Sequence, residues 1–321
     1  MATVVTSEDP RIRIDTLASA LGSAHTVRSE DLSSTDRVVE AAASADALVV
    51  DTGVPVPTAV FENCGSLEVL ARAGTGVDNI DVSAAEDHGV VVTNVPEYCT
   101  EEVSTHAVSL FLTLFRRIKT YDRAIENGRW DWTDGQPIGR LSEQTIGFHS
   151  FGAIAKRAAE KLGGFDCELL AADPYVDAEE MDAYGVRKVE FGELLREADH
   201  ISIHAPLTEE THHRFDREAF ERMNDRGILI NVGRGPIVDQ KALYRALDAG
   251  EIAAAGLDVL NEEPPENSAL VGREDVAVTP HTAFYSEQSV RDLNEHVAAD
   301  ITAVFEGRRP DGLVEPDAPW L

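Results

Sequence analysis

Lysine is nearly absent from this chain. Five lysines stand beside 23 arginines and 58 acidic residues, for a net charge of -30 over 321 residues. Because nucleic acid is a polyanion, such a charge disfavours binding to it. The acidic residues are spread along the whole sequence rather than gathered in one tail. A surface of this kind is expected in a salt-rich cytoplasm, where counterions screen the self-repulsion, so we expect a halophilic protein that binds no nucleic acid.

Cysteine is also scarce, and long apolar runs are missing. Cys64, Cys99 and Cys167 are isolated and lack metal-ligand spacing, so we expect no disulfide framework and no bound metal. No apolar run approaches the roughly 18 residues of a membrane span, and the first residues lack the pattern of a signal peptide. The sequence thus predicts a cytoplasmic protein that does not cross a membrane.

Short apolar segments alternate with amphipathic ones from the start of the chain, which predicts an α/β fold built on parallel sheets. The length favours two domains. The expected elements of the first domain, residues 1–97, are strands at 2–6, 47–50, 67–72 and 89–93 and a helix at 16–21. Residues 94–99 break the alternation, which predicts a domain boundary there.

A long helix is predicted over 103–118, with Thr100 as its N-cap and acidic residues in its first turn. Apolar residues cover much of its circumference, which fits either a subunit contact or a core helix within one subunit. Trp130 and Trp132 follow in a polar loop. For these two, a structural or interface role is favoured over ligand binding.

The stretch that ends at Asp173 has the layout of a dinucleotide-binding unit: strand, glycine turn, helix, strand and acid. Its glycine fingerprint fits two registers. In one, His149 replaces the middle glycine and would block the close approach of a phosphate. In the other, the middle position is Gly152, with small Ser150 and Ala155 on either side and the acid about 20 residues on. We prefer the second register, although an ordinary strand-helix turn would also fit.

Four further predicted strands, at 200–203, 227–232, 254–258 and 276–279, each end in polar or turn residues. In an open parallel sheet the ligand crevice lies outside the carboxyl ends of the strands. The side chains expected there are His204, Asn231, Arg234, Asp258 and His281. A closing helix over 286–305 is expected to return to the first domain, and residues 307–321 are expected to be loosely held.

Hydride transfer to a nicotinamide needs a proton donor, a cation for the substrate oxygens and an oriented cofactor. His281 can exchange a proton near neutral pH, and Glu263 also follows a strand end, where it can partner an imidazole. Arg234 lies between two glycines and can present its planar guanidinium to a carboxylate. Taken singly, a structural histidine, a surface-loop glutamate and an arginine paired with Asp239 remain open alternatives.

A second candidate carboxylate site lies in the first domain. Arg72 ends a predicted strand, and the turn Gly74-Thr75-Gly76 follows with exposed backbone N–H groups. An ordinary glycine turn explains the same residues equally well. The joint placement of both candidate sites at strand ends favours the functional interpretation.

Four segments carry a resemblance to a known family: ARAGTGVDNID (71–81), NVGRGPIVD (231–239), GLDVLNEEPP (256–265) and TPHTA (279–283). Together with Asp173, they make the chain resemble the D-isomer-specific 2-hydroxyacid dehydrogenases over nearly its whole length. Two more segments, NVPEYCTEEV (94–103) and HTAFYSEQS (281–289), are similar to the branch containing the C-terminal binding proteins. That branch includes NAD-sensing corepressors as well as enzymes.

The resemblance implies two doubly wound parallel-sheet domains. These are a flavodoxin-like substrate domain from 1–97 plus 286–321 and a Rossmann NAD-binding domain from 98–285. A homodimer through the helix after Thr100 is also implied. The implied catalytic residues are Arg234, Glu263 and His281. The residues implied to bind the substrate, a small 2-hydroxy or 2-keto acid, are Arg72, Gly74, Thr75 and Gly76. The residues implied to bind NAD are Ser150, Phe151, Gly152, Ala153, Ile154, Asp173, Ala205, Pro206, Thr211, Val232, Gly233 and Asp258.

Three features depart from the family pattern. Ser150 and Ala155 replace glycines, and His149 occupies a usually apolar strand position. Phe284 stands where the corepressor branch tends to carry tryptophan, so the substrate cannot be inferred from that branch.

The resulting hypothesis is an NAD-dependent enzyme that interconverts a D-2-hydroxy acid and its 2-keto acid. Arg234 would hold the keto acid, and Glu263 would keep His281 protonated during reduction. Asp173 would favour NAD over NADP. The alternative is an NAD(H)-sensing binding protein with little turnover. Oxidation of formate or another small anion is less favoured.

Overall fold

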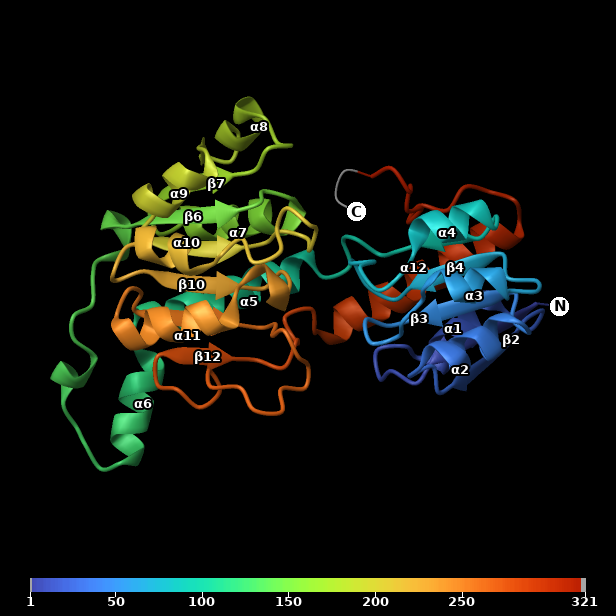
Figure 1. Cartoon of the computed structure of the whole chain (residues 1–321), viewed down its shortest axis with the longest axis horizontal. Coiled ribbons are helices and arrows are strands. Elements are labelled where there is room, and N and C mark those ends of the chain that lie inside the picture. Colours follow the sequence, from blue (N-terminus) through green and yellow to red (C-terminus); the bar gives the residue numbers. More distant parts are fainter. Residues whose placement is uncertain (1, 319–321) are drawn as a thin grey trace. The chain divides into compact units, whose positions relative to one another are not determined.

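The computed structural model describes residues 2–318 and divides into two compact units (Figure 1). Unit 1 contains the residues up to Cys99 and those from Tyr285 onward, and unit 2 runs from Thr100 to Phe284. The chain therefore leaves unit 1 once and returns to it once.

Unit 1 is built on a five-stranded parallel sheet with the order β2-β1-β3-β4-β5. Its strands are β1 (Thr3–Ser7), β2 (Thr26–Glu30), β3 (Ala47–Val50), β4 (Val69–Arg72) and β5 (Val91–Thr93). Strands β3 and β4 are buried at every position, as expected for apolar strands covered on both faces. The order is that of flavodoxin-like folds, with the reversal between β1 and β3. Strand β2 was not anticipated from the sequence because it is short and largely polar.

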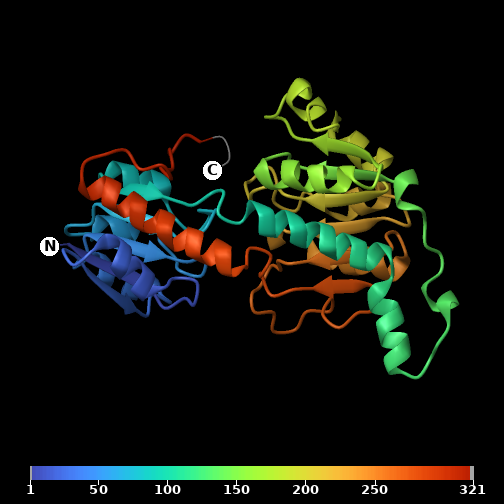
Figure 2. The ribbon, with the colours of Figure 1, turned by 180° about the vertical axis from the view of Figure 1, so that it is seen from behind.

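Helices cover both faces of this sheet. They are α1 (Ile14–Leu21), α2 (Thr35–Ala42), α3 (Thr58–Glu62), α4 (Val82–Asp87) and α12 (Glu287–Phe305). The closing helix α12 packs beside α1 and against β4, although it comes from the far end of the chain (Figure 2). Its buried Leu293, Val297 and Ile301 join the core formed with β1, β3 and β4. Ser286 is the N-cap of this helix and forms a capping box with Ser289.

The expectation of a loosely held C-terminal segment was wrong for residues 311–314. Gly312 accepts a hydrogen bond from the Asn94 N–H at 2.8 Å, and Val314 donates to Val92 at 2.9 Å. Asp300 of α12 accepts from the N–H of Gly312 at 3.2 Å. These backbone bonds fasten the segment beside β5, so a Pro- and Asp-rich composition does not imply weak attachment. Residues 319–321 of that expectation lie outside the described part of the chain.

Unit 2 is built on a seven-stranded parallel sheet with the order β12-β11-β10-β9-β6-β7-β8. Its strands are β6 (Thr145–His149), β7 (Glu168–Ala172), β8 (Arg187–Lys188), β9 (His200–Ile203), β10 (Ile228–Asn231), β11 (Ala254–Leu257) and β12 (Val276–Val278). The order reverses between β6 and β9. Taken in sequence, this is the doubly wound order of the Rossmann fold with one strand added at the β12 edge.

The helices of unit 2 lie on both faces of the sheet. They are α5 (Thr100–Phe115), α6 (Ile118–Glu126), α7 (Ala153–Gly163), α8 (Ala178–Asp182), α9 (Phe191–Glu197), α10 (Arg217–Arg222) and α11 (Gln240–Ala249). Short 3-10 turns occur at Trp132–Gly135, Leu141–Glu143 and Gly235–Ile237. Helices α5 and α7 lie side by side on one face (Figure 2). Helices α9, α10 and α11 contribute to the core on the other.

Two expectations for the long helix were wrong. Thr100 is the first helical residue rather than the N-cap, and its buried hydroxyl has no hydrogen-bond partner within residues 2–318. The helix ends at Phe115 instead of Ile118, because Arg117 adopts a left-handed conformation (φ 56°) and α6 starts anew. Most of the apolar surface of α5 is buried within unit 2, which favours the core-helix interpretation for α5 itself.

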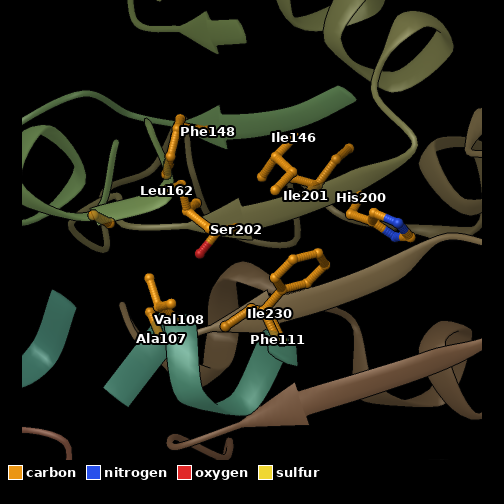
Figure 3. A pocket seen from close by; sticks show the side chains of 11 residues that line it. Ala107, Val108, Phe111, Ile146, Phe148, Leu162, His200, Ile201, Ser202 and Ile230 are labelled. Atoms are coloured by element: carbon orange, nitrogen blue, oxygen red, sulfur yellow. The ribbon is translucent and has the colours of Figure 1, made fainter. Parts of the chain in front are cut away.

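A small cavity lies inside unit 2 between α5, α7 and the sheet (Figure 3). Its volume of about 10 Å³ is close to the lower limit for a single water molecule. The walls are apolar apart from His200 and Ser202. This cavity is a gap in the packed core rather than a substrate site. Within residues 2–318, no helix is long and apolar enough to cross a membrane.

Candidate functional site

The carboxyl ends of the unit 2 strands gather most of the expected site residues. Because all seven strands are parallel, these ends meet at one edge of the sheet. The loops that follow β6, β7, β9, β10, β11 and β12 there contain Ser150, Asp173, Ala205, Val232, Asp258 and His281. Topology therefore brings together residues that are distant in sequence.

His281 and Glu263 form a direct hydrogen-bonded pair at this edge. The Nδ1 atom of His281 lies 2.7 Å from Oε2 of Glu263. The other carboxylate oxygen accepts from the N–H of Leu260 at 2.9 Å. Burial raises the pKa of Glu263, but the His281 contact, the Leu260 N–H and the charge of Arg234 outweigh it and hold the pKa below 4.5. Glu263 is thus an ionised acceptor that orients the imidazole and leaves Nε2 for proton exchange.

Asp258 anchors the backbone that carries His281. Its carboxylate accepts from the N–H of Thr282 and of Ala283, both at 2.9 Å, and its carbonyl accepts from the N–H of His281 at 2.8 Å. His281 has a φ of 49°, which is unfavourable for a side chain with a Cβ and costs about 1 to 3 kcal/mol. The side chain of Asp258 is 2% exposed, so these bonds are shielded from water. The carboxylate therefore fixes a strained segment.

The loop after β10 places Arg234 close to the same edge. Asn231 donates its side-chain amide to the carbonyl of Arg234 at 2.9 Å and accepts from the N–H of Gly233 at 3.0 Å. Gly235 must be glycine, since a Cβ there would collide with the backbone of Leu260. This close approach joins the Arg234 loop to the loop that carries Glu263. The guanidinium lies near enough to lower the pKa of that carboxyl group. Asp239, a candidate partner of Arg234, caps α11 through the N–H groups of Lys241 and Ala242.

The turn between β6 and α7 follows the second fingerprint register in its geometry. Ser150 occupies the left-handed region (φ 71°), where glycine is normally favoured. Its hydroxyl donates to Asp173 at 3.0 Å, and the N–H of Phe151 donates to the same carboxylate oxygen at 2.8 Å. Gly152 is the N-cap of α7, and a Cβ added there would meet nothing within 4 Å. Because position 152 is not crowded, a pyrophosphate can approach the backbone N–H groups of the first helical turn, at Ala153 and Ile154.

His149 lies in the strand rather than in the turn. It is packed among Phe191, Phe215 and neighbouring core residues, and neither ring nitrogen has a hydrogen-bond partner within residues 2–318. Gly147, the first position of the rejected register, packs against Leu194, where a Cβ would meet a methyl carbon at 2.5 Å. The glycine at 147 is thus explained by packing between the sheet and α9.

The remaining expected cofactor residues lie in two adjacent loops. Ala205 and Pro206 follow β9, and Thr211 closes that loop by donating its hydroxyl to the Pro206 carbonyl at 2.7 Å. Val232 and Gly233 follow the neighbouring strand β10, and a Cβ on Gly233 would come within 2.7 Å of the Ala205 carbonyl. The two loops therefore pack against each other at the carboxyl ends of β9 and β10.

In unit 1, Arg72 ends β4 and is 2% exposed. Its guanidinium donates to the Ala73 carbonyl and covers Gly74, where a Cβ would collide with it. The carbonyl of Thr75 accepts from the amide of Asn94 at 2.6 Å. Gly76 follows in the same turn. The structure thus brings the four expected substrate residues of unit 1 together at one strand end.

Further charged groups lie near Arg72 in unit 1. Arg11 forms a close ion pair with Asp9 at 2.7 Å, and Asp51 is 3.9 Å from it. Burial raises the pKa of Asp9, but bonding to Arg11 outweighs this and lowers it. Burial also raises the pKa of Tyr98, which lies close to both arginines. The sequence had offered no reason to select these residues.

Two unit 2 residues were also missed. His106 of α5 contacts the hydroxyl of Thr279 at 2.9 Å through Nε2, and that hydroxyl donates to Asp258 at 2.6 Å. A usable signal existed for each. Thr279 directly precedes Pro280 and His281, and His106 directly precedes the mostly apolar part of α5, 107–115. Within residues 2–318, no group of three or more His, Cys, Asp or Glu residues has a metal-binding arrangement.

Comparison with known proteins identifies relatives along most of the chain. Residues 108–283 match the model of the D-isomer specific 2-hydroxyacid dehydrogenase NAD binding domain. The chain is 36% identical to glyoxylate reductase of Korarchaeum cryptofilum, over 87% of this chain and 86% of that protein. It is 35% identical to D-3-phosphoglycerate dehydrogenase of Methanocaldococcus jannaschii, over 88% of this chain and 54% of that protein. The chain spans about half the length of the D-3-phosphoglycerate dehydrogenases that it resembles.

A solved structure shows the same arrangement of elements. The D-lactate dehydrogenase of Aquifex aeolicus, determined with NAD and lactic acid, superposes with a TM-score of 0.87 at 26% identity, covering 95% of this chain and 96% of that one. These findings bear out the family resemblance and the α/β fold, whereas the narrower resemblance to the C-terminal binding protein branch stays a prediction. The chain belongs to the D-isomer specific 2-hydroxyacid dehydrogenase family, and unit 2 contains its NAD-binding domain.

Proposed function

We propose that this protein is an NAD-dependent oxidoreductase that interconverts a D-2-hydroxy acid and the corresponding 2-keto acid. The observation that carries the proposal is the His281–Glu263 pair, 2.7 Å apart, at the strand edge of an NAD-binding domain. Family membership supports it, since the relatives bear the names of dehydrogenases and reductases of such acids. The alternative of an NAD(H) sensor with little turnover is not favoured, because a sensor does not need a complete proton-transfer pair.

The proposed steps assign one role to each side chain. Arg234 holds the substrate carboxylate with its guanidinium. His281 gives a proton from Nε2 to the keto oxygen during reduction and takes it back during oxidation. Glu263 accepts from Nδ1 and stabilises the charged imidazole. The nicotinamide, when bound, supplies or receives the hydride.

The proposed cofactor contacts follow from the β6–α7 turn. Gly152, Ala153 and Ile154 present backbone N–H groups to the pyrophosphate, and Asp173 accepts from the adenosine ribose hydroxyls. Because a carboxylate repels a 2'-phosphate, Asp173 favours NAD over NADP. Ser150 and Phe151 already donate to this carboxylate, so they orient it and also share its lone pairs.

Unit 1 is proposed to supply the substrate-binding residues Arg72, Gly74, Thr75 and Gly76. A buried guanidinium beside a glycine turn offers charge and backbone N–H groups to a carboxylate. Substitution of Arg72 by Lys is expected to raise the KM for the keto acid more than the KM for NADH, because a lysine cannot reproduce the planar fork. An equal rise of both would contradict this assignment.

We also propose a homodimer, with its contact at α6 and the turn after it rather than at α5, because most apolar residues of α5 are buried within unit 2. Ile118, Ile125, Trp130 and Trp132 of this region are all more than half exposed, which is unusual for large apolar side chains on a monomer. Replacing Trp130 and Trp132 by serine is expected to shift the protein toward monomer in light scattering after gel filtration. An unchanged mass would refute this surface as the contact.

A salt-rich cytoplasm is proposed as the working environment. The net charge of -30 is unscreened at low ionic strength, so the folded state repels itself there. Dialysis into low salt is expected to unfold the protein, as followed by circular dichroism, and KCl is expected to restore it. Full stability at low salt would contradict the proposal.

The central test follows NADH consumption at high KCl with a panel of 2-keto acids: glyoxylate, pyruvate, hydroxypyruvate and 3-phosphohydroxypyruvate. Turnover of at least one member is expected. His281→Ala should lower kcat by about 100-fold or more while NADH fluorescence titration gives an unchanged Kd. Tight NADH binding without turnover of any member would instead support the sensor.

A further inference from the structure

A chain of hydrogen bonds runs from helix α5 into the segment that carries His281. It links Nε2 of His106 to Oγ1 of Thr279 at 2.9 Å and the same oxygen to Oδ1 of Asp258 at 2.6 Å. The Asp258 carboxylate can only accept, so the threonine proton points to it. Oγ1 must then accept from His106, which places a hydrogen on Nε2. The direction of every bond in the chain is thereby determined.

The hydrogen-bond chain ends at the carboxylate of Asp258, which accepts several hydrogen bonds at once. Asp258 Oδ1 also accepts from the Thr282 N–H, and Oδ2 accepts from the Ala283 N–H. The Thr279 hydroxyl and the His281 backbone are thus tied to the same residue, which is itself nearly inaccessible to water. If Asp258 rotates, the bonds on both sides of His281 change together. His281 has a positive φ and needs such support to keep its conformation.

We propose that His106 and Thr279 are positioning residues for the reaction. They hold the Asp258 carboxylate in one orientation, and through it they hold the segment 279–283 and the direction of the His281 imidazole. This inference rests on the proposed function, in which His281 exchanges the substrate proton. Neither residue is required to touch the substrate or NAD.

If His106 and Thr279 had a purely structural role, their loss would alter folding more than turnover. His106 is 23% exposed at the side chain, and one hydroxyl bond contributes little to a large domain. Loss of this hydrogen-bond chain should therefore lower kcat far more than it lowers the free energy of unfolding. A displacement of the reacting group by about 1 Å can lower the rate about 100-fold.

The first experiment compares Thr279→Val, which keeps the shape without the hydroxyl, with Thr279→Ser, which keeps the hydroxyl. The Val variant is expected to lower kcat by about 10- to 100-fold, and the Ser variant should recover most of the loss. The NADH Kd should stay within about twofold of the native value in both. Thr105→Val is the matched control, because it removes a hydroxyl that donates to the Glu101 carbonyl on the same helix.

A double-mutant cycle tests whether the two residues act as one chain. His106→Phe removes the donor, and His106→Gln retains an N–H donor. If the chain is linear, His106→Phe combined with Thr279→Val should cost no more than Thr279→Val alone. Independent, multiplying effects would overturn the proposal. A weakened NADH Kd that matches the loss in kcat would likewise overturn it and place Thr279 in the cofactor site.

A second measurement does not depend on activity. The amides of His281, Thr282 and Ala283 all donate to Asp258, so deuterium exchange in a peptide that covers 279–283 reports on this anchor. Thr279→Val should exchange several-fold faster there, whereas Thr105→Val should match the native protein. Unchanged exchange would refute the positioning role. If exchange accelerates but the native protein turns over no keto acid, the proposed function fails while the anchoring stands.

Discussion

Three histidines buried in unit 2 should make the protein sensitive to acid. Burial lowers the pKa of His149 to about 4, and Arg214 acts in the same direction while Asp173 opposes it. Burial likewise lowers the pKa of His200 to about 4 and that of His204 to about 3. In the unfolded chain these groups titrate near 6.5. Each is therefore neutral in the folded state over a pH range in which the unfolded chain binds a proton.

The direction in which pH changes the free energy of unfolding follows from proton binding. Since the unfolded state binds more protons below about pH 6.5, stability is fully present above that pH and is lost as the pH falls toward about 4. Each histidine lowers the free energy of unfolding by up to about 1.4 kcal/mol for each pH unit of acidification. The three histidines together lower the free energy of unfolding by roughly 3 to 4 kcal/mol between about pH 6 and about pH 5. This is a large part of the roughly 5 to 15 kcal/mol that stabilises a typical domain.

The assay is urea unfolding at a series of pH values and constant high KCl, which screens the acidic surface. His149→Phe is the informative variant, because the ring centroid lies 5.2 Å from that of Phe191 and 5.4 Å from that of Phe215. The slope of unfolding free energy against pH should fall by about one third. His296→Gln, at an exposed position on α12, is the control and should keep the native slope. The same slope for His149→Phe as for the native protein would refute the reasoning.

The remaining predictions concern Asp173 and Ser150, which are hydrogen-bonded to each other. Asp173→Asn is expected to raise the ratio of kcat/KM for NADPH to that for NADH, because the repulsion of a 2'-phosphate is removed; an unchanged ratio would argue against contact with the ribose. Ser150→Gly relieves about 1 kcal/mol of left-handed strain and loses a hydrogen bond of similar size, so the unfolding free energy should change by less than about 1 kcal/mol. NADH should bind more tightly to Ser150→Gly in fluorescence titration, because Asp173 loses a competing donor. Ser150→Ala keeps the strain, loses the same bond and should be about 1 kcal/mol less stable than the native protein in urea.

Much of the fold was predictable because its signals are local. Strands β3 and β9 occupy the residues expected from their apolar runs, and the register of the βαβ unit was chosen from the position of Gly152. Strand β2, by contrast, is largely polar and lies at the edge of its sheet, so periodicity did not reveal it. The attachment of residues 311–314 was missed for another reason, since backbone bonds to a distant strand leave no compositional trace.

The amino-acid sequence was sufficient to establish the order of the strand-end residues and the chemical types available: an imidazole, carboxylates, guanidinium groups and glycine turns. Those are properties of short segments, and they were enough to indicate the family. The folded chain was needed to show that Nδ1 of His281 contacts Glu263, that Ser150 donates to the Asp173 carboxylate, and that His106 contacts Thr279 across 173 positions of sequence. Such contacts depend on the strand order and on angstrom-scale packing of helix against sheet. Neither is encoded in any single segment.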